Sequence, residues 1–131
     1  MQHPMSDVAV LVIDMLNTYR HDDEGERPEL VEPIAPEEGT LFLEKVRHSA
    51  FYATPLAYLL GRLETKRLIL TGQVTEQCIL YTALDAYIRH FAVAVPPDAV
   101  AAILPDLGQA ALQMMERNMR VELVPAEKCL G

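Results

Sequence analysis

The chain has 131 residues, of which half are apolar and 6% aromatic, and its formal net charge is −8 at pH 7. This composition is typical of a globular protein with a single domain over residues 1–131, and it excludes an intrinsically disordered chain. The acidic balance argues against nucleic acid as a partner, because a negative protein repels phosphates.

Cysteine content and hydropathy indicate the compartment. Two cysteines, Cys78 and Cys129, make no disulfide framework, and no apolar run is long enough to span a bilayer. Residues 1–5 lack the basic and apolar regions of a signal peptide. We therefore expect a cytoplasmic protein with no membrane partner, and we interpret Cys129, near the C-terminus, as structural.

The first half of the chain contains one confident strand. Residues 8–13 form a continuous apolar run rich in β-branched side chains, which predicts a buried parallel strand with Asp14 at its carboxyl end. Residues 17–39 are polar, rich in Pro, Glu and Asp and without a sustained period, so we expect an unusually long loop. Residues 40–44 predict a short strand, and residues 55–64 predict a helix with a proline near its first turn. The leucines on its inward face are Leu56, Leu59, Leu60 and Leu63.

The second half alternates strands with helices. It predicts strands over residues 67–71, 91–95 and 121–124, and helices over residues 76–90 and 106–120. Thr75 is the expected N-cap of the first helix. The inward face of the second holds Leu107, Ala110, Ala111, Met114 and Met115. This alternation indicates the α/β class, with an open parallel sheet and helices on both faces.

Residues 71–78 read Thr-Gly-Gln-Val-Thr-Glu-Gln-Cys, between a predicted strand and a predicted helix. This order puts Cys78 in the first turn of a helix at the carboxyl end of a strand, where an open α/β sheet has its ligand crevice. Backbone N–H groups and the helix dipole favour a thiolate there. Asp14 and Lys45 also follow predicted strands, so the three side chains are expected to meet at one edge of the sheet.

These three residue types suit nucleophilic catalysis. A thiolate of Cys78 would attack a carbonyl-type carbon, and Asp14 would take the thiol proton and return it to the leaving group. Lys45 would keep both groups ionised and lower the pKa of the cysteine. The N–H groups of Val74 and Cys78 would hold the oxyanion.

Each residue also has a structural interpretation. A cysteine at a helix start is more often a small buried hydrophobic residue. An aspartate after a strand is often a turn residue, and a lone lysine is usually solvated. The pattern alone leaves both interpretations open.

Three segments resemble the isochorismatase-like cysteine hydrolase family. Residues 11–17, Leu-Val-Ile-Asp-Met-Leu-Asn, are similar to its D-x-Q/L-N strand end, and residues 44–54 to its K-x-R-x-S-A-F-x-x-T segment. Residues 68–100 are similar to its G-x-x-T-x-x-C-V…T-A-x-D-A…D-A block. The resemblance covers most of the chain outside residues 18–38, and it implies an abbreviated Rossmann-like isochorismatase fold.

The resemblance also implies roles for individual residues. The catalytic triad of the family falls on Asp14, Lys45 and Cys78. A non-proline cis peptide bond falls between Gln73 and Val74, and it would aim the Val74 N–H at the substrate oxygen.

Two aromatic residues are candidate walls of the substrate pocket. These are Phe51 and Tyr19, and each is as readily interpreted as a core residue.

The chain departs from the family between the first strand and the lysine segment. Family members carry a helix, a strand and a loop there, whereas residues 18–38 are the only connection in this chain. The metal ligands of nicotinamidase-type members lie in that region. The four histidines rebuild no spaced cluster, so we expect no metal site and no cofactor. They are His3, His21, His48 and His90.

The missing elements have a structural consequence. Without the neighbouring strand, the first strand is left with an open edge, or the later short strand pairs with it. An open edge invites another chain, so we expect a homo-oligomer that covers the gap. The same gap removes part of the pocket wall, which leaves open whether the chain is active.

Three functions follow from these observations. The leading hypothesis is hydrolysis of a small-molecule amide or related C–N bond through a thioester on Cys78. The second is an isochorismatase-type hydrolysis of a vinyl ether, in which Asp14 protonates the substrate and the cysteine is dispensable. The third is a catalytically silent module for binding or assembly.

Overall fold

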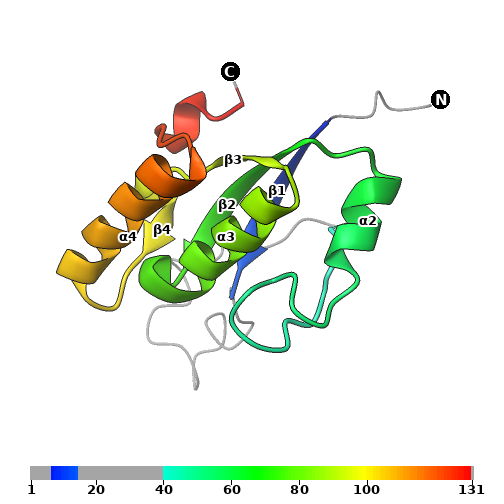
Figure 1. Cartoon of the computed structure of the whole chain (residues 1–131), viewed down its shortest axis with the longest axis horizontal. Coiled ribbons are helices and arrows are strands. Elements are labelled where there is room, and N and C mark those ends of the chain that lie inside the picture. Colours follow the sequence, from blue (N-terminus) through cyan, green and yellow to red (C-terminus); the bar gives the residue numbers. More distant parts are fainter. Residues whose placement is uncertain (1–6, 15–39, 131) are drawn as a thin grey trace.

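The computed structural model describes residues 7–14 and 40–130, and its sheet is built around β2 (Arg67–Gln73) (Figure 1). β1 (Val8–Ile13) pairs with β2 in parallel along one edge, in a register that joins Val8 to Arg67 and Ile13 to Gly72. Both strands were predicted and both are confirmed, but the burial expected of β1 is wrong for Val10 and Val12. The described strands thus form a parallel sheet with β1 at one end of the strand order.

The other edge of β2 is shared by two short strands. β3 (Ala92–Ala94) pairs in parallel with its first half, and β4 (Val100–Ala101) pairs in parallel with its carboxyl end. β3 is shorter than the predicted strand over residues 91–95, and β4 was not predicted. A turn of 3-10 helix, η4 (Pro97–Ala99), joins them. β2 therefore has backbone partners on both sides, which places its carboxyl end at the centre of the sheet.

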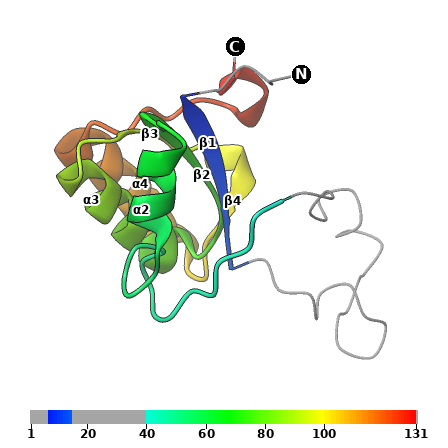
Figure 2. The same cartoon turned by 90° about the vertical axis from the view of Figure 1, so that its right-hand side faces the viewer.

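Three α-helices lie on the same side of the sheet (Figure 2). They are α2 (Leu56–Arg62), α3 (Leu80–Ile88) and α4 (Pro105–Met119). The fully buried Leu68 and Leu70 of β2 belong to one hydrophobic core with residues of all three helices. None of the helices in the described ranges is long and apolar enough to cross a bilayer.

On the opposite face of the sheet, the described part of the chain contributes no α-helix, and helix cover of that face stays a prediction (Figure 2). In the described part of the chain, a short 3-10 turn, η5 (Ala126–Lys128), lies near that face, and Cys129 forms a small buried cluster with Ile69 of β2 and Ala94 of β3. Arg67 donates a hydrogen bond to the Cys129 carbonyl oxygen (2.8 Å), which ties this segment to the start of β2. Burial of Cys129 in this cluster accords with its structural interpretation.

Further along that face, two valines of β1 are exposed. Val10 and Val12 retain 50% and 57% of their accessible surface. Val8, Val10 and Val12 lie on the same face of the sheet as Ile69. Val8 packs against the small cluster around Cys129, whereas Val10 and Val12 do not belong to that cluster. A homo-oligomer that covers this region stays a prediction.

Two predicted strands are wrong. Residues 40–44 form no strand in the described structure, and residues 121–124 contribute one parallel bridge, between Glu122 and Ala94. A strand needs a continuous hydrogen-bonded neighbour. Leu41 and Phe42 are exposed, and the segment that they belong to has no such neighbour among the described residues.

The predicted helices exist with shifted ends and faces. The helix predicted over residues 76–90 starts as a π-helical turn, η3 (Thr75–Ile79), and continues as α3. Its N-cap is Val74, and Thr75 is buried without a capping hydrogen bond. The helix over residues 55–64 is shortened to α2.

The inward face of α4 is turned relative to the prediction. Ala111 and Met115 are buried as expected, but Leu107 and Met114 are exposed and Ala110 is also at the surface. Gly108 and Leu112 are buried in their place. α4 packs on η3 and α3. The residues that it buries, and that form its inward face, are Gly108, Ala111, Leu112 and Met115.

Candidate active site

The site lies where β1 and β2 end side by side. Asp14 directly follows β1, and the register brings it level with Gln73 at the end of β2. The Gln73 side-chain amide donates a hydrogen bond to the Asp14 backbone carbonyl (3.1 Å). Asp14 has a φ of 57°, a left-handed conformation that aspartate tolerates better than most residues. Its carboxylate is thus presented at the carboxyl edge of the sheet.

Gly72 allows the two strands to approach at this point. Its φ is 109°, which side-chain-bearing residues rarely adopt. A Cβ at this position would overlap the backbone of Ile13, above all its carbonyl oxygen. The glycine is therefore required by both backbone conformation and close packing beside Asp14.

Cys78 lies in η3, directly after the end of β2. The peptide bond between Gln73 and Val74 is cis, and the Val74 carbonyl accepts hydrogen bonds from the N–H groups of Gln77 (3.0 Å) and Ile79 (3.1 Å). Cys78 keeps 7% of its accessible surface. The first turn of a helix has backbone N–H groups without intrahelical partners, so this thiol sits beside hydrogen-bond donors.

Lys45 brings the site together from a third segment. Its Nζ donates a hydrogen bond to Cys78 Sγ at 3.3 Å and forms an ion pair with Asp14 Oδ2, also at 3.3 Å. One ammonium group therefore bridges the thiol and the carboxylate. The structure brings two of the predicted residues, Asp14 and Cys78, into contact with the third, Lys45, and we refer to Asp14, Lys45 and Cys78 as the Cys78 cluster.

The segment after Lys45 is fastened to the helices by hydrogen bonds. The Ala50 N–H donates to Thr82 Oγ1 of α3 (3.0 Å), and Thr54 Oγ1 donates to the Ala50 carbonyl (2.5 Å). Ser49 is buried and its Oγ accepts from the Phe51 N–H (3.2 Å). Thr82 is fully buried, and sequence reasoning predicted no role for it beyond its place in the third similar segment. Its hydroxyl group accepts the hydrogen bond that positions the loop carrying Lys45.

The direction of the Cys78 pKa shift differs from the prediction. Burial raises the pKa of the Cys78 thiol, and its hydrogen bond with Asp14 raises the pKa further. Lys45 lowers this pKa, as predicted, but does not offset the other two effects. The expected net lowering is therefore wrong, because the sequence does not reveal how much water the site loses. A raised pKa favours the protonated thiol, so a nearby base would be needed to take its proton.

The remaining predicted site residues are the pocket-wall candidates and the N–H groups expected to bind the oxyanion. Phe51 keeps 5% of its accessible surface, and its ring contacts Phe91 (centroids 6.1 Å apart) and lies under the Arg89 guanidinium (4.9 Å). This ring belongs to the core, and a part in the pocket wall stays a prediction. Tyr19 lies outside the described residues. Oxyanion binding by the N–H groups of Val74 and Cys78 also stays a prediction.

A metal site was not expected from the histidines. Within residues 7–14 and 40–130, no three His, Cys, Asp or Glu side chains cluster closely enough to hold a metal ion. His3 and His21 lie outside the described residues.

Glu76 has a role that sequence reasoning missed. Its carboxylate accepts hydrogen bonds from the N–H groups of Ile103 (3.2 Å) and Leu104 (2.8 Å), at the start of α4. These bonds, above all the one from Leu104, lower the pKa of the Glu76 carboxyl group. Glu76 thus joins the turn that carries Cys78 to a helix 28 residues further along the chain.

We expect Glu76→Gln to destabilise the fold at neutral pH and to have less effect in acid. A folded-state pKa below the unfolded value stabilises the fold above the unfolded pKa, near 4, and this contribution is lost as the pH falls through the folded pKa. Thermal unfolding at pH 7 and pH 3 measures the difference. An equal loss at both pH values would contradict this assignment, and Glu116→Gln on the exposed surface of α4 is the control.

The fold and the cluster together define an α/β protein with a candidate cysteine nucleophile at the carboxyl edge of its sheet. The chain belongs to the isochorismatase family, since the family model of the isochorismatase domain matches residues 20–127. The resemblance to this family is thereby confirmed, and the match includes two of the three similar segments, residues 44–54 and 68–100. The matched range contains Lys45 and Cys78, whereas Asp14 precedes it.

Curated relatives carry the same family name or the name of an amide hydrolase. The chain is 33% identical over 117 residues to the uncharacterized isochorismatase family protein YaaI of Bacillus subtilis, a match that covers 89% of this chain and 65% of YaaI. It is 38% identical over 88 residues to ureidoacrylate amidohydrolase RutB of Methylorubrum extorquens, covering 66% of this chain and 36% of that protein. The chain thus spans less than two thirds of the length of these relatives.

Solved structures of nicotinamidases have a similar fold. The nicotinamidase PncA of Bacillus subtilis superposes with a TM-score of 0.67 at 25% sequence identity, covering 89% of this chain and 73% of that one. The nicotinamidase SaPncA of Staphylococcus aureus gives a TM-score of 0.65 at 28% identity, covering 76% and 62%. The predicted α/β class and parallel sheet are confirmed by this likeness.

Proposed function

We propose that the protein hydrolyses a small-molecule amide or related C–N bond, with Cys78 as the nucleophile. The observation that carries this proposal is the position of Lys45 Nζ, 3.3 Å from Cys78 Sγ and 3.3 Å from Asp14 Oδ2. A cation in contact with both a thiol and a base brings together the groups that acyl transfer needs. The names of the amidohydrolase and nicotinamidase relatives support an amide as the substrate.

The proposed reaction starts from the protonated thiol. Asp14 removes the proton from Cys78 as the sulfur attacks the carbonyl carbon, and the carbonyl oxygen becomes an oxyanion. Asp14 then gives this proton to the amine nitrogen, the C–N bond breaks and a thioester remains on Cys78. Water, deprotonated by Asp14, attacks the thioester, the acid departs and the thiol regains its proton.

Two other groups stabilise charge during these steps. The Lys45 ammonium offsets the developing negative charge on sulfur and keeps the Asp14 carboxylate in place. In this proposal the backbone N–H groups of Val74 and Cys78 hold the oxyanion in the turn that starts η3. No step requires a metal ion or an organic cofactor.

The vinyl-ether alternative uses the same carboxylate differently. The Asp14 side chain keeps 30% of its accessible surface, so a substrate could receive a proton from it directly. In that reaction Cys78 would not bond to the substrate. The two reactions therefore differ in their need for sulfur.

Cys78→Ala is the test of the amide reaction. We expect turnover of an amide to fall by about three orders of magnitude or more, because the nucleophile is removed. Turnover of a vinyl ether such as isochorismate would persist. Cys129→Ala, which removes the other thiol from a cluster at the opposite end of β2, should retain amide turnover. Unchanged amide hydrolysis by Cys78→Ala would refute the proposal, and a wild-type chain inactive on both substrate classes would favour the silent module.

A further inference from the structure

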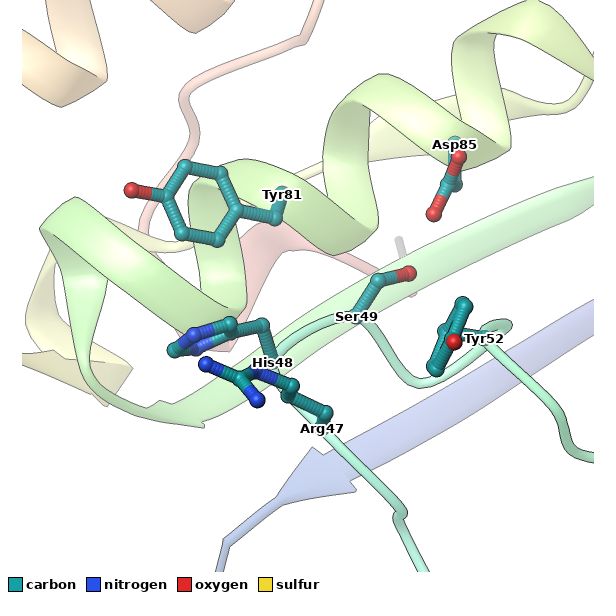
Figure 3. Close-up of a pocket in the computed structure, with 6 residues that line it drawn as sticks. All are labelled: Arg47, His48, Ser49, Tyr52, Tyr81 and Asp85. Carbon is teal, nitrogen blue, oxygen red and sulfur yellow. The ribbon is translucent and has the colours of Figure 1, made fainter.

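The loop after Lys45 runs beside the helical segment formed by η3 and α3, as Figure 3 shows. One attachment between them is the hydrogen bond from Lys45 Nζ to Cys78 Sγ (3.3 Å). A second is the hydrogen bond from the Ala50 N–H to Thr82 Oγ1 (3.0 Å). Thr82 follows Cys78 by four residues, a spacing that puts two side chains on one face of a helix, and both are buried. The sulfur and this hydroxyl group are therefore neighbouring attachment points for one loop.

The two attachments differ in their access to water. Thr82 is fully buried, whereas the Lys45 side chain keeps 20% of its accessible surface. Between them, the exposed His48 and Tyr81 rings pack edge to face with centroids 5.6 Å apart. A hydrogen bond to a buried group competes less with water, and its loss leaves a donor without a partner. The bond at Thr82 is thus the better protected attachment of the loop.

The backbone of this loop needs such an attachment. His48 and Ala53 have φ angles of 52° and 54°, in the left-handed region that is unfavourable for residues with a side chain. Conformations of this kind persist where the surrounding structure imposes them. Ala50 lies between the two, and its carbonyl group accepts a hydrogen bond from Thr54 Oγ1 (2.5 Å). Thr54 Oγ1 in turn accepts one from the Leu56 N–H at the start of α2 (3.3 Å). The backbone groups of Ala50 therefore connect α3 with α2.

We propose that Thr82 is a positioning residue for Lys45: by accepting the Ala50 N–H, its hydroxyl group holds the loop on α3 and thereby keeps the ammonium group at the sulfur of Cys78. The inference deepens the proposed function and rests on it, since Lys45 stabilises the attacking sulfur in that reaction. Thr82 acts on the sulfur through Lys45 and not directly. Its effect on Cys78 should therefore vanish when the lysine is absent.

The first test follows the pH dependence of Cys78 alkylation by iodoacetamide, which needs no turnover. Lys45 lowers the pKa of the Cys78 thiol, so the pKa is higher when the lysine moves away. We expect the alkylation profile of Thr82→Val to shift to higher pH, in the direction expected for Lys45→Met. In the Lys45→Met background, Thr82→Val should add no further shift. An unchanged profile in Thr82→Val, or an equal shift in both backgrounds, would overturn the proposal.

Three further variants separate the hydroxyl group from packing. Thr82→Ser keeps the hydroxyl group and should retain the wild-type profile. Thr82→Ala lacks it, should behave like Thr82→Val, and takes its place if the valine variant does not fold. Thr65→Val makes the same change at another buried threonine, between α2 and β2, and should leave the profile unchanged. A profile shifted as far by Thr82→Ser as by Thr82→Val would mean that side-chain volume matters and the hydrogen bond does not, against the proposal.

The second test is turnover of an amide. Thr82→Val should lower kcat about 10- to 100-fold with little change in KM, since Lys45 acts on charge that develops during the reaction. Thr82→Ser should stay within about twofold of the wild type. A higher KM with an unchanged kcat in Thr82→Val would contradict the positioning role. A wild-type chain without amide turnover would refute the proposed function, while the alkylation profiles would still decide the role of Thr82.

Discussion

Asp14→Asn is expected to slow amide hydrolysis strongly and at the same time to make Cys78 react faster with iodoacetamide. The Asp14 carboxylate raises the pKa of the thiol through its hydrogen bond and its charge, while Lys45 lowers it. Asparagine removes the negative charge and leaves Lys45 in contact with the sulfur. The thiolate fraction near pH 7 therefore rises, but the group that carries the proton to the leaving amine is lost.

The two effects have opposite signs, so one protein preparation tests both. Loss of the general acid and base should lower kcat/KM by about 10² to 10⁴. The pH profile of alkylation, followed by mass spectrometry of the peptide that contains Cys78, should shift to lower pH. Lys45→Met is the opposing variant: its profile should shift to higher pH, because only the groups that raise the pKa remain. Slower alkylation in Asp14→Asn would mean that the carboxylate does not hold the thiol in its protonated form.

Gly72→Ala is expected to have the largest effect on stability. The new Cβ would meet the Ile13 backbone at a φ of 109°, so β1 and β2 must separate where Asp14 leaves the sheet. Backbone strain and overpacking together correspond to about 3 kcal/mol or more. In a domain of this size the melting temperature should fall by roughly 10 °C, and amide turnover should fall with it because the carboxylate moves away from Lys45.

Gly61→Ala provides the control for this substitution. Gly61 lies within α2, and a Cβ there would meet no atom within 4 Å. Alanine favours a helix over glycine, so this variant should be stabilised by about 0.5–1 kcal/mol. If the two alanine variants melted at the same temperature, the close approach of β1 and β2 at Gly72 would not limit the fold.

The positions of the site residues could be predicted from the sequence because the ends of strands are local features. Asp14 follows an apolar run and Cys78 follows a strand-to-helix junction, and both boundaries are visible without tertiary information. Lys45 is different: it was selected because it follows the strand predicted over residues 40–44, and that strand is absent, so the residue was right and the local reason was wrong. The similarity of residues 44–54 to the family segment pointed to the same lysine. The long-range hydrogen bonds that Thr82 and Glu76 accept could not be predicted, since each joins groups about 30 residues apart.

Properties that depend on packing were predicted less well. The direction of the Cys78 pKa shift follows from competing effects of burial, Asp14 and Lys45, and burial is set by the whole core. The face of α4 is decided by contact with η3 and α3, which its own periodicity does not contain. The covering of the second sheet face depends on where residues 126–129 return to the strands.

The hydrogen bond between Ala50 and Thr82 has a mechanical consequence. It joins the loop that carries Lys45 to α3, the helix that continues the turn containing Cys78. The Asp14 backbone is held separately, through the Gln73 side chain at the end of the central strand, while its carboxylate pairs with Lys45. A movement of this helical segment relative to the sheet would therefore strain the ion pair between Lys45 and Asp14.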